Sequence, residues 1–456
     1  MGFLRPRAVV GLAMVASFMV FVDGTIVNVT LGQLAEHLGA SRAELEWAVN
    51  AYTLAFAALM LGAGAIADTV GAKRAFLAGL LVFTASSAVC AVAGSMLMLN
   101  VARLVQGAGA ALLLPSALVL ATASATDERD RHRLVSWWAA AGGAGMAAGP
   151  LLGGGLVALA NWRAVFAVNV VIGIPAALWA WRAMPSVVRR PRRLDLVGMA
   201  TATAFIGGLV FALIEAPVRG WFDPAVVGAV GVIVAGVTAF VLVERSARVP
   251  LLPTRLYGER GFVAVAVQGA LLNFVFYGVL FSMSLLLQQG RGLSALITGL
   301  LFLPLTGLIS VANLTSAPLV ARFGRSAVLA TGQAVITVAL VALAWASTAD
   351  AVWPMVLALI PLGLSSGVLV PTMTAQSIAS VEPGLHGAAS AAFNTSRQIG
   401  GAIGVATFGP LLGAAHELGG GFVSCALVAA GASVLGLGVA VVGRGTARLV
   451  PSNDTA

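Results

Sequence analysis

Charged residues are scarce in this chain. Of its 456 residues, 26 are Lys or Arg and 17 are Asp or Glu, whereas 59% are hydrophobic and the mean hydropathy is +0.99. A soluble domain carries about 25% charged residues because it must keep its surface hydrated. The shortage therefore excludes a water-soluble enzyme, a disordered chain and, despite the net charge of +9, a nucleic-acid-binding protein. We expect most of the exterior to face lipid.

Cysteine and lysine are also rare. Cys90 and Cys425 lie in apolar stretches without polar metal partners, which predicts two buried apolar side chains rather than a disulfide or a metal site. Lys73 is the only lysine beside 25 arginines, and Ala and Gly are abundant, a bias typical of high-GC bacteria. We find no nucleophile, metal or cofactor constellation, so the sequence predicts no enzyme, no metal and no cofactor.

Long apolar runs fill the chain. A helix needs about 20 apolar residues to cross a bilayer. Reading polar and Gly/Pro breaks as loops predicts fourteen spans: 8–30, 47–67, 75–94, 97–120, 134–158, 163–184, 196–215, 223–243, 261–288, 295–317, 326–347, 352–376, 387–412 and 421–443. The chain is thus predicted to be an all-α integral membrane protein and a monomer.

Basic residues divide unequally between the two sides of these spans. Twenty lie on the side of the termini and only Arg42, Arg163, Arg219 and Arg291 on the other. By the positive-inside rule both termini are predicted to be cytoplasmic, in a multi-pass protein of the cytoplasmic membrane.

The sequence contains an internal repeat. Gly324 follows Gly71 by 253 residues in a similar loop, and Gly400 and Gly404 follow Gly145 and Gly149 by 255. Spans 1–6 then correspond to spans 9–14, which predicts an N-terminal six-helix half at 1–195, an inserted helix pair at 196–243 and a C-terminal six-helix half at 244–456. Two such halves are the architecture of a transporter that rocks one half against the other.

Two charges inside the first half are candidates for proton coupling. Asp23 is placed about 22 Å along a helix that starts near Ala8, in the outer half of the span, and apolar neighbours surround it. Such a carboxyl group can exchange a proton or meet a cation. Arg103, near the outer end of span 4, always carries its charge and is the candidate partner of Asp23.

Other polar residues are expected to line a substrate cavity together with aromatic residues. The predicted cavity consists of Phe21, Asn50, Phe56, Asn273, Phe274, Tyr277, Asn394 and Arg397. By contrast, we interpret Glu36, Glu44, Glu46 and Glu215, at the outer boundary, as solvated loop charges.

Four motifs resemble those of the major facilitator superfamily, in its fourteen-helix drug:proton antiporter branch of multidrug efflux transporters. The loop with Gly64, Asp68, Gly71, Lys73 and Arg74 resembles the conformational-switch motif. The glycine-rich part of span 5 resembles the antiporter motif, and the stretches at Asp23–Asn28 and Arg103–Gly107 resemble the motifs of spans 1 and 4. The antiporter-motif residues are Gly145, Gly149, Pro150, Gly153 and Gly154.

The resemblance implies the major facilitator fold, with two inserted central helices, and a role for the span-4 motif in proton translocation. One departure concerns the switch motif, in which Thr69 and Ala72 occupy places where the family usually has Arg. This departure leaves the strength of the cytoplasmic gate open.

The sequence therefore predicts proton-coupled export of hydrophobic, cationic or neutral drug-like molecules. The partners are a small-molecule substrate, protons and the lipid bilayer. One alternative is a dedicated exporter of a single antibiotic or metabolite that gives self-resistance, and a second is a transporter-like ligand sensor. An importer is disfavoured by the span-5 motif.

Overall fold

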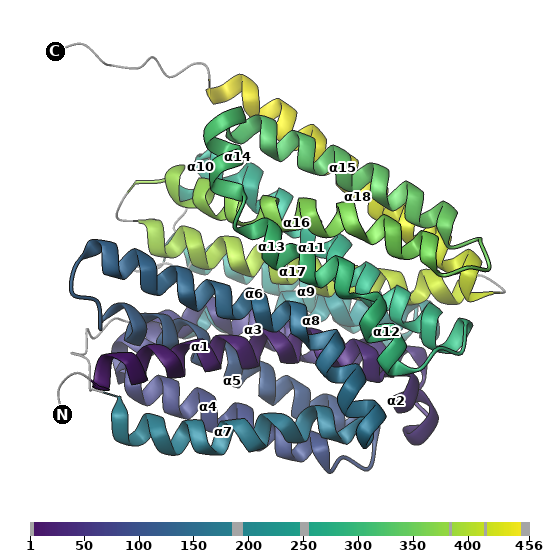
Figure 1. Ribbon diagram of the computed structural model, residues 1–456, viewed down its shortest axis with the longest axis horizontal. Coiled ribbons are helices and arrows are strands. Elements are labelled where there is room, and N and C mark those ends of the chain that lie inside the picture. Colours follow the sequence, from purple (N-terminus) through teal and green to yellow (C-terminus); the bar gives the residue numbers. More distant parts are fainter. Residues whose placement is uncertain (1–3, 185–194, 247–254, 383–384, 415–416, 448–456) are drawn as a thin grey trace.

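The chain folds into long helices that run in a common direction (Figure 1). This computed structural model describes residues 4–184, 195–246, 255–382, 385–414 and 417–447. The helices are α1 Leu4–Ile26, η1 Val27–Thr30, α2 Leu31–Leu38, α3 Arg42–Val70, α4 Ala72–Ala91, α5 Met96–Thr122, α6 Glu128–Leu159, α7 Arg163–Ala183, α8 Leu196–Arg219, α9 Pro224–Ser246, α10 Arg255–Gly258, α11 Arg260–Leu285, η2 Leu286–Gly290, α12 Ala295–Leu301, α13 Leu303–Asn313, α14 Ser316–Phe323, α15 Arg325–Ala346, α16 Trp353–Ala379, α17 His386–Ala414 and α18 Leu418–Ala447.

Twelve helical segments of the described chain are long and apolar enough to cross a membrane, rather than the fourteen predicted. The two predicted spans without such a segment are 47–67 and 387–412, which fall in α3 and α17. Each of these helices has 29 residues, so length is not the reason. In α3 the side chains of residues 61, 65 and 68 lie outside the described part of the chain, and in α17 polar residues such as Arg397 and Gln398 interrupt the apolar stretch.

The first span is longer than predicted. α1 continues through η1 and α2, so that the apolar segment runs from Ala8 to Leu38. The polar residues of α2 had marked it as a loop, but Leu31 and Leu34 are buried and keep this turn in the bundle. Asp23 is therefore 15 residues from either end, at the middle of the span and not in its outer half.

The two switch-type loops have the same backbone geometry. Gly71 ends α3 with φ +97°, and its N–H donates to the carbonyl oxygen of Ala67 at 2.9 Å. Gly324 ends α14 with φ +79°, and its N–H donates to the carbonyl oxygen of Val320, also at 2.9 Å. Positive φ favours glycine, which explains why glycine stands at both positions, 253 residues apart.

The helices form two bodies side by side. In Figure 1 the helices from α1 to α7 lie together below those from α11 to α18, and α1 begins at the same end of the molecule as α18 ends. The two bodies touch between α6 and α13, where Thr306 Oγ1 donates to the carbonyl oxygen of Ala147 at 3.0 Å and Ser310 Oγ to that of Gly143 at 3.2 Å. They also touch between α3 and α17, at the end of the bundle where α3 begins and α17 ends, here called the α3/α17 end.

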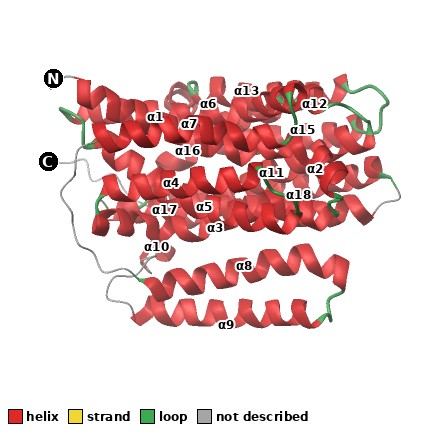
Figure 2. Ribbon diagram, turned by 90° about the horizontal axis from the view of Figure 1, so that it is seen from below, coloured by secondary structure: helices red, strands yellow, loops and turns green. Residues whose placement is uncertain are grey.

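Helices α8 and α9 form a separate layer beside the bundle (Figure 2). Ile206, Val210 and Ile214 of α8 pack in one apolar cluster with Leu54 of α3 and with two alanines of α17. Helix α8 therefore lies across the seam between the two bodies.

The surface is apolar and the interior holds small and polar groups. Leu97 and Trp345 are each 75% exposed, as expected for side chains that face lipid. Cys90 and Cys425 are free thiols with 0% exposure, which confirms their predicted burial.

Glu46 is not the solvated loop charge that the sequence predicted. Its side chain is 2% exposed and packs on Gly409 of α17, where a Cβ atom would clash with the carboxylate. One turn earlier on α3, Arg42 packs on Gly413 in the same way. Glu215 is also held, since Oε1 accepts from Trp47 Nε1 at 3.0 Å and Oε2 pairs with Arg219. The sequence did not predict the burial of Glu46 or the contacts of Glu215, because these residues lie at a helix interface and not in a loop.

Candidate functional site

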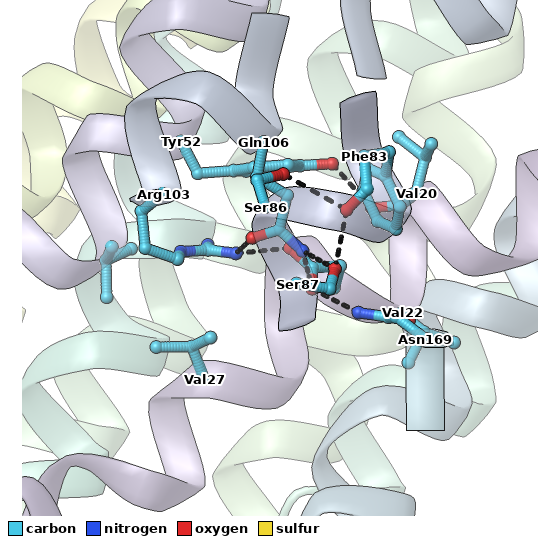
Figure 3. Close-up of polar contacts among 12 residues, drawn as sticks. Val20, Val22, Val27, Tyr52, Phe83, Ser86, Ser87, Arg103, Gln106 and Asn169 are labelled. Carbon is cyan, nitrogen blue, oxygen red and sulfur yellow. Dashed lines mark hydrogen bonds and ion pairs between the residues drawn. The ribbon is translucent and has the colours of Figure 1, made fainter. Parts of the chain in front are cut away.

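Asp23 and Arg103 form an ion pair inside the first body, and Figure 3 labels Arg103 with its neighbours Gln106, Ser87, Asn169 and Tyr52. Arg103 Nη1 donates to Asp23 Oδ2, and the two side chains are 1% and 0% exposed. The sequence predicted that these two charges share a depth, and the structure brings them together. Because a buried charge is costly unless it is paired, each of the two depends on the other.

Two amides complete the shell around the carboxylate. Gln106 Nε2 donates to Asp23 Oδ1 at 2.9 Å, and Asn169 Nδ2 donates to the same oxygen at 2.7 Å. Gln106 also accepts from Arg103 Nη1 at 2.8 Å and donates to Ser87 Oγ at 2.7 Å. Side chains from α1, α5 and α7 thus meet at one carboxylate, and Ser87 of α4 accepts from Gln106.

Arg103 is held in place by helix α3. Its Nε donates to the carbonyl oxygen of Ala48 at 3.0 Å, and its guanidinium carbon lies 4.4 Å from the centre of the Tyr52 ring. Tyr52 in turn donates to the carbonyl oxygen of Val20 on α1 at 2.9 Å. A movement of α3 relative to α1 would therefore disturb the ion pair directly.

The network has no net charge and no contact with solvent. A proton on Asp23 would leave Arg103 as an isolated buried cation, which is unfavourable by several kcal/mol. Proton uptake at Asp23 therefore requires Arg103 to find another partner or to reach water, and either change means that helices move. This arrangement can couple protonation to conformation.

The corresponding positions of the second body are apolar. Two equivalent helix crossings define which positions correspond. A Cβ at Gly107 of α5 would clash with the carbonyl oxygen of Tyr52. A Cβ at Gly363 of α16, 256 residues later, would lie 2.5 Å from the carbonyl oxygen of Leu305. With the same offset, Leu359 and Leu362 stand in the places of Arg103 and Gln106, and both are buried. The ionic network belongs to one body only.

The predicted antiporter-motif glycines bring α6 close to α1. A Cβ at Gly145 would lie 2.5 Å from the carbonyl oxygen of Phe18, and one at Gly153 would lie 3.0 Å from that of Ile26. A Cβ at Gly149 would collide with Thr25. Close backbone approach is the usual function of small residues between membrane helices.

The same motif faces the second body on another side. A Cβ at Gly154 would lie 2.6 Å from the carbonyl oxygen of Ala295 on α12, and Gly299 of α12 lies on the carbonyl oxygen of Pro150. Helix α6 therefore touches α1 with one face and α12 with another, which puts this motif at the boundary between the bodies.

Substitution of Gly145 tests the importance of this crossing. Gly145→Ala is expected to destabilise the protein by about 1–3 kcal/mol, because the clashing atom is a backbone oxygen that cannot rotate away. Gly155→Ala is the matched control, since nothing lies within 4 Å of its added Cβ. Thermal unfolding of the two purified variants measures the difference, and equal stability would contradict the close contact.

The switch-motif residues are less completely described. Lys73 Nζ donates to the carbonyl oxygen of Trp181 at the end of α7, at 2.9 Å, so it connects two helices of the same body. Arg74 is exposed, nothing lies within 4 Å of a Cβ at Gly64, and Gly71 has the turn geometry given above. The side chain of Asp68 lies outside the described residues.

The predicted cavity residues occupy different environments. Asn50, Phe56, Asn273 and Tyr277 are buried, whereas the other four predicted residues are partly accessible: Phe21, Phe274, Asn394 and Arg397. Phe274 packs edge-on against Phe408 with 5.2 Å between ring centres, and Asn394 donates to the carbonyl oxygen of Ser390 on its own helix.

Part of this set meets between α11 and α17. Arg397 Nε donates to Asn273 Oδ1 at 3.3 Å, and Asn273 Nδ2 donates to Gln398 Oε1 at 3.4 Å. The second body thus has a polar cluster of its own, built around a cation.

Sequence reasoning did not single out Asn169, Ser87 or Tyr52 as partners of the ion pair. Asn169 is a lone amide in an otherwise apolar helix, and that isolation was the available signal. Asn28, the amide nearest to Asp23 in the sequence, donates to the carbonyl oxygen of Thr25 and not to Asp23.

Comparison with known proteins identifies relatives over most of the chain. A methylenomycin A resistance protein of Bacillus subtilis (strain 168) is 37% identical over 407 residues, which covers 89% of this chain and 87% of that protein. The cephamycin export protein CmcT of Amycolatopsis lactamdurans is 37% identical over 411 residues, covering 87% and 82%. The multidrug resistance protein Stp of Mycobacterium tuberculosis (strain ATCC 25618 / H37Rv) is 31% identical over 402 residues, covering 87% and 74%.

The fold is also that of known transporters. A POT family transporter, solved in complex with a thioalcohol conjugated peptide, aligns with a TM-score of 0.72 over 98% of this chain and 97% of that one, at 13% identity. A family model described as Major Facilitator Superfamily matches residues 13–405. The chain therefore belongs to the Major Facilitator Superfamily and is a multi-pass membrane transporter rather than an enzyme.

Proposed function

We propose that this protein exports hydrophobic drug-like molecules across the cytoplasmic membrane in exchange for protons. The observation that carries the proposal is the sealed ion pair of Asp23 and Arg103, since it links the protonation of a mid-membrane acid to the positions of four helices. Relatives named for antibiotic resistance and export support the direction of transport.

In this proposal the chain has fourteen crossing helices. Helices α3 and α17 are each about 42 Å long at 1.5 Å per residue, which exceeds the roughly 30 Å of hydrocarbon. Their polar residues face neighbouring helices: Asn50 has 0% exposure, and Arg397 bonds to α11. This count agrees with the fourteen-helix drug:proton antiporter branch and with halves at 1–195 and 244–456 around an inserted pair at 196–243.

The proposed cycle uses the contacts between the two bodies. If both termini are cytoplasmic, the α3/α17 end faces the outside. At this end Glu46 packs on Gly409, and Gly154 packs on the backbone of Ala295. The described structure is then closed toward the outside. Outward opening would separate α3 from α17, and an accompanying shift of α3 relative to α1 and α5 would pull Ala48 and Tyr52 away from Arg103 and free Asp23 to take up a proton. The switch and antiporter motifs would guide this movement.

Dye transport in inverted membrane vesicles tests the proposal. A pH gradient with an acidic interior is expected to drive uptake of a hydrophobic dye, and collapse of that gradient by nigericin is expected to stop it. Uptake that is indifferent to the gradient would refute proton coupling.

A dedicated exporter of one antibiotic is the second candidate. It is favoured by the two 37% identical relatives, whose names each specify one compound or one antibiotic class. A drug panel in an efflux-deficient host separates the candidates, because a dedicated exporter protects against a single class only.

A further inference from the structure

The polar cluster of the second body contains a cation without a counter-charge. Arg397 lies on α17, eleven residues after the helix begins, or about 16 Å along its axis of about 42 Å. No carboxylate lies within 4 Å of its nitrogen atoms in the described part of the chain. A guanidinium keeps its charge under all physiological conditions, so this position is permanently positive.

The rest of the bundle does not neutralise Arg397. Asp23 is occupied by Arg103, Gln106 and Asn169 in the first body. Glu46 packs on Gly409, which lies twelve residues, or about 18 Å, beyond Arg397 on α17. The neighbourhood of Arg397 therefore carries a net charge of about +1, which attracts anions more strongly in a low-dielectric interior than in water.

The guanidinium of Arg397 is hydrogen-bonded at Nε, whereas its two terminal nitrogens, Nη1 and Nη2, have no partner among the described residues. Asn273 accepts from Nε and is itself oriented by Gln398, while the Arg397 side chain packs on Gly269. Its two terminal nitrogens make no hydrogen bond to any described residue, and the side chain is partly accessible. Paired N–H groups in this arrangement match the two oxygens of a carboxylate.

The repeat places this cluster close to the depth of the proton site. Asn273 follows Phe21 by 252 residues, and Arg397 follows Gly142 by 255. In the first body Gly142 packs on Phe21, and in the second body Arg397 bonds to Asn273. These two contacts therefore occupy equivalent positions in the two repeats. Phe21 is two residues before Asp23, and transporters of this architecture bind their substrates near the bilayer midplane.

We propose that Arg397 binds a carboxylate group of the transported molecule. The proposal rests on the proposed export function, but it changes the expected substrate from a cationic or neutral compound to an acidic or zwitterionic one. Tyr277 of α11, which packs on Gly401 one turn beyond Arg397 on α17, would contact the apolar part of the substrate.

Rhodamine B and its ethyl ester provide a test, because they share a fluorophore and differ in one carboxylate. Binding to the full-length protein in nanodiscs is measured by fluorescence anisotropy. We expect the wild type to bind rhodamine B more tightly than the ester. Arg397→Gln is expected to weaken rhodamine B binding about tenfold or more and to leave the ester almost unchanged. Arg397→Lys keeps the charge but not the paired donors, and an intermediate affinity is expected.

Arg260→Gln is the matched control, since Arg260 is an exposed arginine at the start of α11. It is expected to bind both dyes like the wild type. The proposal is overturned if the wild type does not prefer the acid, or if Arg397→Gln weakens both dyes equally or neither. Because binding is measured without a gradient, a protein that shows this preference but no proton-driven uptake would refute the proposed function alone.

Discussion

Asp23→Asn is expected to reduce proton-driven dye uptake to the level of vesicles without the protein. The amide has almost the shape of the carboxylate, but it cannot take up and release a proton, so the step that links the gradient to helix movement is lost. Uptake into inverted vesicles with an imposed pH gradient measures this. Asp350→Asn makes the same chemical change at an exposed acid and is expected to transport like the wild type.

A second measurement separates lost coupling from lost folding. Asparagine leaves Arg103 as a buried cation without a counter-charge, and breaking a buried pair costs about 3–5 kcal/mol. Thermal unfolding in detergent and dye binding at equilibrium report whether the variant is folded. A folded Asp23→Asn variant that still pumps at the wild-type rate would exclude Asp23 as the coupling acid.

The ion pair was predictable because charge is so rare in the spans. Asp23 and Arg103 were the two lone charges of the first half, and burial without a partner would be too costly for either. The amide partners were not predictable, since a single amide in a membrane helix, such as Asn169 in α7, can bond to many different groups. Only the fold shows that Asn169 reaches the same oxygen atom as Gln106.

Errors in the predicted spans have one physical cause. Hydropathy treats each residue as if it faced lipid, but Gln33 of α2 accepts from the backbone N–H of Trp162, and Glu46 of α3 packs against α17. Glu46 was therefore assigned to a loop although it is buried against Gly409, and the first span was ended eight residues before Leu38. Burial between helices depends on tertiary packing, which local composition does not encode.

Arg397 shows a related limit. The sequence placed it with Asn273 and Asn394 in a predicted substrate cavity, and in the structure it bonds across to Asn273 of α11. Its lack of a carboxylate partner among the described residues appears only in the folded structure. The charge expected of the substrate depends on that pairing, which is why the sequence alone predicted a cationic or neutral substrate.

The apolar equivalents in the second body lead to the last prediction, a variant that folds but cannot couple. Val275 occupies the position of Asp23 in the second body, since α11 follows α1 by 252 residues. Leu359 and Leu362 occupy the positions of Arg103 and Gln106. All three are at most 2% exposed, so this crossing packs well without charges. The triple variant D23V/R103L/Q106L is expected to lose all proton-driven transport and to remain folded.

Comparison with the single variant Arg103→Leu makes the test quantitative. Arg103→Leu leaves the Asp23 carboxylate buried and unpaired, at a cost of about 3–5 kcal/mol, whereas the triple variant removes both charges. The triple variant still leaves the Asn169 amide without its acceptor, which costs about 1–3 kcal/mol. Its unfolding temperature is therefore expected to lie between those of Arg103→Leu and the wild type. A triple variant less stable than Arg103→Leu would mean that the charges are needed for packing, because removal of both should relieve the penalty that removal of one creates.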